Sequence, residues 1–555
     1  MRVNKINKKN AFLSIIVLSL GVMFIFSFNP KNDKLFSIAK NLDIFASLIR
    51  ELDSYYVDEI NADELVTVGI NAMLEELDPY TEFIPEEDSD DFRMMTTGEY
   101  GGVGAIIGNR TGSNMILMPY KGFPAQVGGL RIGDELLRVD SVNVIKKNTA
   151  EISELLKGPA NTEVEVEVKR GEDTLAVNLK RKKIVISNVP YYGMVDNETG
   201  YIQLSDFTTN ASDDVRKALV DLKAMGAQKL ILDVRDNPGG ILKEAIEIVN
   251  LFIPRGREVV RTIGKLESVN TEYKTKSAPV DKNIPLVVLI NERSASAAEI
   301  VAGALQDYDR AVLVGRKTFG KGLVQSTIPL SYNSQVKLTT AKYYIPSGRC
   351  IQAIDYSIKD EEGNGIYVAD SLRKEFKTKS GRIVLDGGGI EPDKEVAGRS
   401  YAPITYSLVT RSLVFRYANQ YAQQHDSIPS PRNFEVSDEL YQDFVNWLAD
   451  KEYDYTTRVE KTIDDLEDYA QKEKYYEDIK EELASLKKSV GHSKEQDLIT
   501  FNEEIKEALI DEIVSRYYYH EGKIEASLDR DQEIIKSLEV LEDQNVYAML
   551  LKPAK

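Results

Sequence analysis

The most distinct hydrophobic pattern in the chain is an uninterrupted apolar run near its start. Residues 11–30 (AFLSIIVLSLGVMFIFSFNP) contain no charged side chain, and residues 1–10 before them contain basic but no acidic ones. A helix of this length spans about 30 Å, the thickness of the hydrocarbon core of a bilayer. Basic flanks remain on the cytoplasmic side. The pattern predicts a cytoplasmic segment at 1–10, a transmembrane signal anchor at 11–30 and export of the rest of the chain.

A cleaved signal peptide is the alternative for this segment. Signal peptides end in small residues at the cleavage site, whereas Phe26, Ser27, Phe28 and Asn29 fit such a site poorly. A buried core helix is disfavoured because the run is apolar on every face. The sequence therefore favours an uncleaved anchor, and both remaining readings predict export.

The pattern after the anchor changes twice. Apolar residues at helical spacing predict an N-terminal helical region at 35–97, in which Asp78-Pro79 ends the helices and the acidic stretch 86–91 forms a solvated linker. From Gly98 onward, short alternating strands and glycine turns predict a compact β-rich domain at 98–182, with one short helix at 150–156.

Strands and helices then alternate, which predicts an α/β domain at 183–400 with buried and mainly parallel strands. The last segment, 401–555, is helical and heavily charged. The fold class is therefore α/β multidomain. The elements expected in the α/β domain are strands at 229–234, 285–290 and 311–315 and helices at 215–225, 242–252 and 297–305.

Composition narrows the chemistry. The chain has 555 residues and a net charge of −19, so it is long enough for three or four domains and too acidic for a nucleic-acid-binding protein. One cysteine, Cys350, excludes a disulfide framework and a multi-cysteine zinc site. No metal or cofactor is expected. All three histidines lie beyond residue 400, so a Ser-His-Asp hydrolase would need its base from the C-terminal quarter.

Three segments of the α/β domain could carry chemistry. In DVRDNPGG (233–240) the tandem glycines follow a strand and precede a helix, where backbone N–H groups can face a ligand. In NERSASAAEIVAGAL (291–305) Ser296 lies among small residues at a helix start, although GxSxG is absent. In GRKTFGKGLVQS (315–326) Lys321 is a candidate base if burial lowers its pKa from about 10.4. Taken singly, a tight turn, a helix cap and a surface lysine explain these features equally well or better.

Taken together, the segments resemble the carboxyl-terminal processing peptidases, also called tail-specific proteases. The resemblance covers about 40–395. The motifs that carry it are YYVDEI, AMLEELDPYTEFI, GYIQLSDF, LILDVRDNPGG, SASAAEIVAGALQD, GRKTFGKGLVQ, TTAKYYIPSGRCIQ and GGGIEPD. The family usually has SASASE where this chain has SASAAE, so Ala298 replaces a serine that is not the nucleophile.

The resemblance implies a ClpP/crotonase-like serine protease core with an inserted PDZ domain. It implies Ser296 as the nucleophile, Lys321 as the general base and Gln325 as the residue that positions the lysine. It places the oxyanion hole at the backbone N–H of Ala297 and of one glycine in the turn. Which of the two glycines, Gly239 or Gly240, supplies this group is left open.

The resemblance also assigns the β-rich domain to the free C-terminal tails of protein or peptide substrates. The loop Gly101-Gly102-Val103-Gly104 would receive the terminal carboxylate, and the adjacent strand would extend the peptide by β-augmentation. By analogy, the chain belongs in the cell envelope, anchored in the inner (cytoplasmic) membrane, with its catalytic part in the periplasm or elsewhere outside the cytoplasm. A PDZ fold kept as a spacer remains an alternative.

Two other functions compete with a peptidase. A catalytically silent PDZ scaffold of the envelope would not need the Ser-Lys-Gln set, and a crotonase-like acyl-CoA enzyme would not need the PDZ domain or the anchor. The C-terminal helices, 401–555, predict either a surface for an adaptor or self-association, or a solvated appendage that packs on its own chain.

Overall fold

The computed structural model describes residues 30–88, 94, 97–490 and 494–553, in two compact units that divide after Phe83. The predicted anchor at 11–30 lies outside the described residues except at its last position, and it stays a prediction. Within the described part of the chain, no helix is both long and apolar enough to cross a membrane.

The first unit contains the two helices expected between residues 35 and 77. They are α2 (Pro30–Tyr55) and α3 (Ala62–Glu75), followed by the short strand β1 (Glu82–Ile84). Asn61 caps α3, because its side-chain oxygen accepts hydrogen bonds from the backbone N–H groups of Asp63 and Glu64. Part of the predicted linker, Glu86–Asp88, forms a 3₁₀ turn.

The β-rich domain folds around an antiparallel sheet in the order β3-β4-β5-β7-β8. Alternation in β7 buries Val164, Val166 and Val168, as the pattern predicted. The helix α6 packs against β3 and β5, and β2 pairs with β9 beside the sheet. The elements are β2 (Glu99–Gly102), β3 (Ala105–Arg110), β4 (Ser113–Pro119), α5 (Pro124–Val127), β5 (Glu135–Val139), β6 (Val142–Asn143), α6 (Thr149–Leu156), β7 (Glu163–Arg170), β8 (Asp173–Lys180) and β9 (Lys182–Val185).

The α/β domain is built on a sheet in the order β10-β11-β12-β15-β16-β23, whose strands are parallel except for the edge strand β10. This confirms the predicted alternation. Each strand between the edges is buried on both faces, and α7, α8 and α9 pack on one of them. The elements are β10 (Tyr191–Met194), β11 (Thr199–Gln203), α7 (Ala211–Ala224), β12 (Lys229–Asp233), α8 (Leu242–Asn250), β15 (Leu286–Ile290), α9 (Ala297–Asp307), β16 (Val312–Gly315) and β23 (Lys394–Glu395).

A second, antiparallel sheet belongs to the same domain. It contains β17, which pairs with β18, then β13 and β14. Two small hairpins, β19–β20 and β21–β22, follow it in the chain. The elements are β13 (Glu258–Gly264), β14 (Thr271–Lys274), β17 (Leu323–Pro329), β18 (Gln335–Tyr344), β19 (Ile354–Lys359), β20 (Gly365–Tyr367), β21 (Glu375–Lys377) and β22 (Ile383–Leu385).

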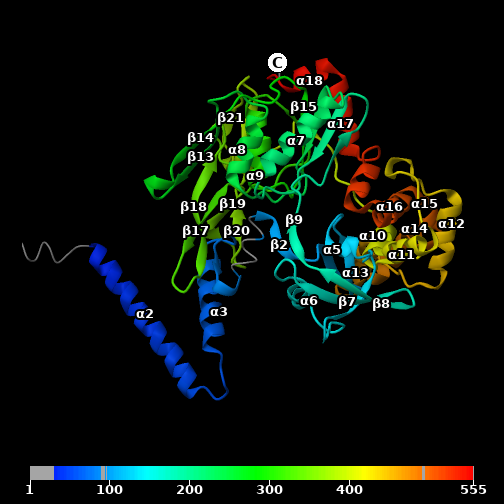
Figure 1. The fold of residues 1–555 in the computed structure, drawn as a ribbon, viewed down its shortest axis with the longest axis horizontal. Helices are drawn as coiled ribbons and strands as arrows, with labels where there is room; N and C mark the ends of the chain where they lie inside the picture. The colour runs from blue at the N-terminus through cyan, green and yellow to red at the C-terminus, as the bar shows by residue number, and fades with distance from the viewer. Residues whose placement is uncertain (1–29, 89–93, 95–96, 491–493, 554–555) are drawn as a thin grey trace, which may run out of the picture. The chain divides into compact units, whose positions relative to one another are not determined.

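The C-terminal segment is helical, as predicted, but it divides into two parts. Helices α10, α11, α12, α15 and α16 contribute to a hydrophobic core separate from that of the parallel sheet. Helices α17 and α18 instead cover the second face of the parallel sheet and lie next to β15 in Figure 1 (red). The elements are α10 (Pro403–Thr410), α11 (Leu413–Gln424), α12 (Asp438–Trp447), α13 (Arg458–Lys472), α14 (Tyr476–Val490), α15 (Lys494–Thr500), α16 (Asn502–Ser527), α17 (Gln532–Glu542) and α18 (Gln544–Leu550).

Candidate active site

The three chemistry-bearing segments meet at one edge of the parallel sheet. The strands β12, β15 and β16 are neighbours, and each of the segments leaves the carboxyl end of one of them. Ligand sites in parallel sheets form at this edge. The segments and β17 enclose a cavity of about 570 Å³. All six predicted catalytic and oxyanion residues line it: Gly239, Gly240, Ser296, Ala297, Lys321 and Gln325.

Ser296 is held in a strained backbone conformation at the start of α9. It is the N-cap residue, with φ of 55° and ψ of −112°. A positive φ costs free energy at a residue with a side chain, and such strain persists only where the surroundings enforce it. The following helix is buried along its whole length. The half-buried serine is therefore presented at a rigid helix N-terminus, where backbone N–H groups favour negative charge.

The buried carboxylate of Glu299 joins the serine segment to the lysine segment. Its Oε2 accepts hydrogen bonds from the backbone N–H of Ser296 at 2.8 Å and of Lys321 at 2.9 Å. Its Oε1 accepts from the Gly320 N–H at 2.8 Å and from the Thr318 hydroxyl at 2.5 Å. Sequence reasoning missed this role, although a glutamate three residues after a serine N-cap is the signature of a capping box.

Tyr343 makes a second link between the same two segments. Its hydroxyl lies within hydrogen-bond distance of the carbonyl oxygens of Ser296 and Lys321, at 3.1 Å from the former. The side chain comes from β18 and is buried. It stands in the motif TTAKYYIPSGRCIQ, but nothing in the local sequence distinguishes it from Tyr344 beside it.

The tandem glycines approach the serine so closely that a side chain would not fit. A Cβ on Gly239 would lie 2.8 Å from the Ser296 Cβ and 2.7 Å from the Ala295 carbonyl oxygen. A Cβ on Gly240 would instead meet the Phe207 carbonyl oxygen at 2.5 Å. The Gly239 N–H donates to the side-chain oxygen of Asn237 at 2.8 Å.

Gln325 lies in the same cavity, on β17. Its side-chain nitrogen donates to the Thr339 hydroxyl at 3.1 Å, across the pair of strands β17 and β18. The assignment of Gln325 as the residue that positions Lys321 stays a prediction.

The predicted carboxylate loop joins β2 to β3. Gly101 and Gly102 belong to β2, so the turn itself consists of Val103 and Gly104. Gly104 has φ of 75°, and a Cβ there would lie 2.6 Å from the Phe123 Cβ. A glycine is therefore required at this position by both conformation and space.

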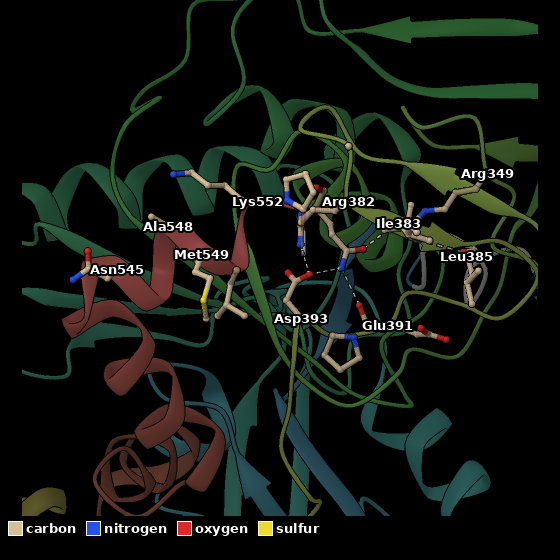
Figure 2. A pocket seen from close by; sticks show the side chains of 16 residues that line it. Arg349, Arg382, Ile383, Leu385, Glu391, Asp393, Asn545, Ala548, Met549 and Lys552 are labelled. Carbon is tan, nitrogen blue, oxygen red and sulfur yellow. Dashed lines mark hydrogen bonds and ion pairs between the residues drawn. The ribbon is translucent and has the colours of Figure 1, made fainter. Parts of the chain in front are cut away.

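A larger cavity, of about 1080 Å³, lies elsewhere, between α18 and the segment that ends at Asp393. Figure 2 shows Arg382 beside Asp393 there, with Met549 and Asn545 on the opposite side. Among the described residues that line it, none is a predicted catalytic residue. The smaller cavity is the site that contains the chemistry.

Burial of Glu299 leads to a prediction for the pH dependence of stability. Burial raises the pKa of this carboxyl from 4.5 to about 7. Between these values the folded chain binds more protons than the unfolded chain, so the group's contribution to stability falls as the pH rises. We expect urea unfolding to show that the stability of the wild type relative to Glu299→Gln declines from about pH 5 to about pH 7. A difference that grows or stays constant over this window would contradict the assignment.

Comparisons with known proteins show which family the chain is similar to. Three family models match: "Peptidase family S41" at 198–360, "PDZ domain" at 116–170 and "Probable PDZ-protease, C-terminal helical domain" at 404–541. The chain is 32% identical to a probable CtpA-like serine protease of Staphylococcus aureus, over 62% of this chain and 71% of that protein. It is 35% identical to a carboxy-terminal-processing protease of Bartonella bacilliformis, over 57% and 73%.

One similar solved structure is a photosystem II D1 C-terminal processing protease, with 28% identity and a TM-score of 0.34 over 58% of this chain and 90% of that one. The sequence similarity, not this overlap, carries the conclusion. The chain belongs to peptidase family S41, as a serine peptidase of the carboxyl-terminal processing type with a PDZ domain and a C-terminal helical domain.

Proposed function

We propose that this chain is a membrane-anchored, exported endopeptidase that binds the C-terminal tails of protein substrates and cleaves them through Ser296 and Lys321. The observation that carries the proposal is the single cavity in which both residues and the glycine turn meet. The apolar run 11–30 with its basic flank supports the anchor and a location at the cell envelope.

The proposed reaction is acyl transfer to the serine. Neutral Lys321 takes the proton of the Ser296 hydroxyl while its oxygen attacks the peptide carbonyl carbon. The lysine then gives this proton to the leaving amine as the C–N bond breaks, which leaves an acyl-enzyme. Water, deprotonated by the same lysine, then attacks the ester carbonyl carbon. The C–O bond to Ser296 breaks, the lysine returns the proton to the serine oxygen, and the new carboxylic acid leaves.

Two backbone N–H groups would stabilise the oxyanion. The Ala297 N–H lies at the start of α9, directly after the nucleophile. Since the Gly239 N–H is bonded to Asn237, Gly240 is the better candidate for the second donor. Glu299 and Tyr343 would hold the serine and lysine segments in register during the reaction.

The PDZ domain would bind the substrate tail between β3 and α6. These two elements pack against each other, and the turn at Val103 and Gly104 lies at the start of β3. Backbone N–H groups of the turn would donate hydrogen bonds to the terminal carboxylate, and β3 would pair with the extended peptide.

A matched pair of substrates tests the proposal. An unstructured polypeptide with an apolar tail would be offered with a free C-terminal carboxylate and, in parallel, with a C-terminal amide. Since a hydrogen bond to a charged group is worth about 1.5–3 kcal/mol, we expect cleavage of the free tail to be on the order of 10-fold more efficient. Ser296→Ala should cleave neither.

A different result would contradict each part of the proposal. Cleavage by Ser296→Ala at the wild-type rate would remove the site assignment. Equal cleavage of acid and amide would remove tail recognition and leave the peptidase. Binding of the free tail without cleavage would favour the silent scaffold.

A further inference from the structure

The helix α17 carries a carboxylate that is bonded to two of the three segments of the candidate active site. Glu533, the second residue of this helix, is buried. Its Oε1 accepts a hydrogen bond from Arg316 at 2.6 Å, and its Oε2 accepts one from Arg235. The two arginines are far apart in sequence, and Glu533 is more than two hundred residues from either.

Each arginine lies near the start of one candidate catalytic segment, just after the strand that leads into it. Arg235 follows β12 by two residues and precedes Gly239 by four. Arg316 directly follows β16 and precedes Lys321 by five. Each is also bonded to neighbouring acids: Arg235 to Asp233 and Asp531, and Arg316 to Glu292.

The order of the strands in the sheet shows what the contacts of Glu533 with Arg235 and Arg316 connect. The strands β12 and β16 do not pair with each other, because β15 lies between them. Their separation is therefore two strand spacings, about 9.5 Å. One carboxylate reaches both flanks of the strand that leads to Ser296, and it is shared by two guanidinium groups, each of which also has another acidic partner.

Arg316 and the residue next to Arg235 are also hydrogen-bonded to the serine segment. The Arg316 N–H donates to the carbonyl oxygen of Ile290, the last residue of β15, at 3.0 Å. The N–H of Asp236, next to Arg235, donates to the Asn291 side chain at 3.0 Å. A displacement of either arginine would thus be transmitted to the loop that precedes Ser296.

Packing holds the carboxylate in place. Asp531 caps α17 through the N–H groups of Glu533 and Ile534. Ile534, Val540 and Leu541 of the helix are buried against residues of β12, β15 and β16. The carboxylate is therefore presented to the two arginines by a packed helix.

We propose that Glu533 is a positioning residue of the peptidase, through which the C-terminal helix α17 sets the spacing of the oxyanion turn and the lysine loop on either side of Ser296. This inference rests on the proposed roles of Ser296 and Lys321. It makes α17 a component of the catalytic core, whereas α10, α11, α12 and α15 contribute to the separate core of the C-terminal helices.

The test compares Glu533→Gln with Glu539→Gln in the full-length protein. Glu539 lies on the same helix, is exposed and pairs with Lys536, so it is the matched control. Both would be assayed on the tailed substrate well below their melting temperatures. Since misplacement by about 1 Å can cost 10²-fold, we expect Glu533→Gln to lower kcat by on the order of 10- to 100-fold with KM within about twofold. Its rate of labelling by a serine-reactive fluorophosphonate should fall in parallel.

A second variant keeps the test decisive if Glu533→Gln does not fold. Arg316→Gln leaves Glu533 paired with Arg235 and removes the link from Glu533 to the lysine loop, together with the Arg316–Glu292 ion pair, so it should also lower kcat. Wild-type kcat and labelling in whichever variant is folded would overturn the inference. Ser296→Ala, run beside them, separates the two proposals: if it is inactive while the folded variants match the wild type, only the role of Glu533 fails.

Discussion

Replacement of Lys321 by alanine is expected to lower kcat for a tailed substrate by on the order of 10³-fold, since proton transfer by a positioned base contributes about 10²–10⁴-fold. The side chain lines the same cavity as Ser296, and all histidines of the chain lie beyond residue 400. Its backbone N–H, which bonds to Glu299, is unaffected by the substitution. The loss should therefore appear in kcat with an unchanged melting temperature.

The matched control for this variant is Lys317→Ala, which removes an exposed lysine from the same loop. Steady-state kinetics and a fluorophosphonate labelling rate would be measured for both variants. We expect Lys317→Ala to retain wild-type kcat. If Lys321→Ala also retained it, another group would have to serve as the base, and the Ser-Lys assignment would be wrong.

Replacement of Gly239 by alanine is expected to lower kcat by on the order of 10²-fold or more. The added Cβ would lie 2.7 Å from the Ala295 carbonyl oxygen and 2.8 Å from the Ala297 nitrogen. These are backbone atoms on both sides of the nucleophile, so they cannot move aside without moving Ser296. The positive φ of 97° adds strain of its own.

Gly226→Ala separates the steric effect from the strain. Gly226 has a similar φ of 106°, but a Cβ there would meet nothing within 4 Å. Both variants should lose stability by about 1–2 kcal/mol from the left-handed backbone, while only Gly239→Ala should lose activity. An equal loss of kcat in both variants, or in neither, would contradict a close approach of the turn to Ser296.

The order of the helices and strands could be predicted because short-range pattern dictates it. The alternating valines of β7 and the uniformly apolar β15 report the burial of one face and of two faces, respectively. The boundary of the last domain could not be predicted in the same way. Helices α13 and α17 have similar charged, amphipathic sequences, yet α17 covers the sheet while α13 lies outside its core.

Ser296 and the glycine turn could be singled out because they stand among small residues, and Lys321 because two glycines flank it; the family resemblance then joined them. The partners of these segments could not. Glu299 is ordinary as a capping residue, and its bonds to Thr318, Gly320 and Lys321 depend on the meeting of two strand ends. Contacts of this kind depend on the order of the strands in the sheet. The local sequence around Glu299, Thr318 and Lys321 does not indicate that order.

The sequence by itself identified the peptidase family and its PDZ domain, through motifs that resemble that family, and it predicted the candidate catalytic residues. Only the tertiary structure decided that the carboxylate of Glu533 contacts the glycine-turn segment and the lysine segment. It also decided that Tyr343 links the serine segment to the lysine segment. The physical reason is that burial and charge pairing depend on distances in space. Between residues far apart in the sequence, these distances are set by the folded structure and cannot be read from the local sequence pattern.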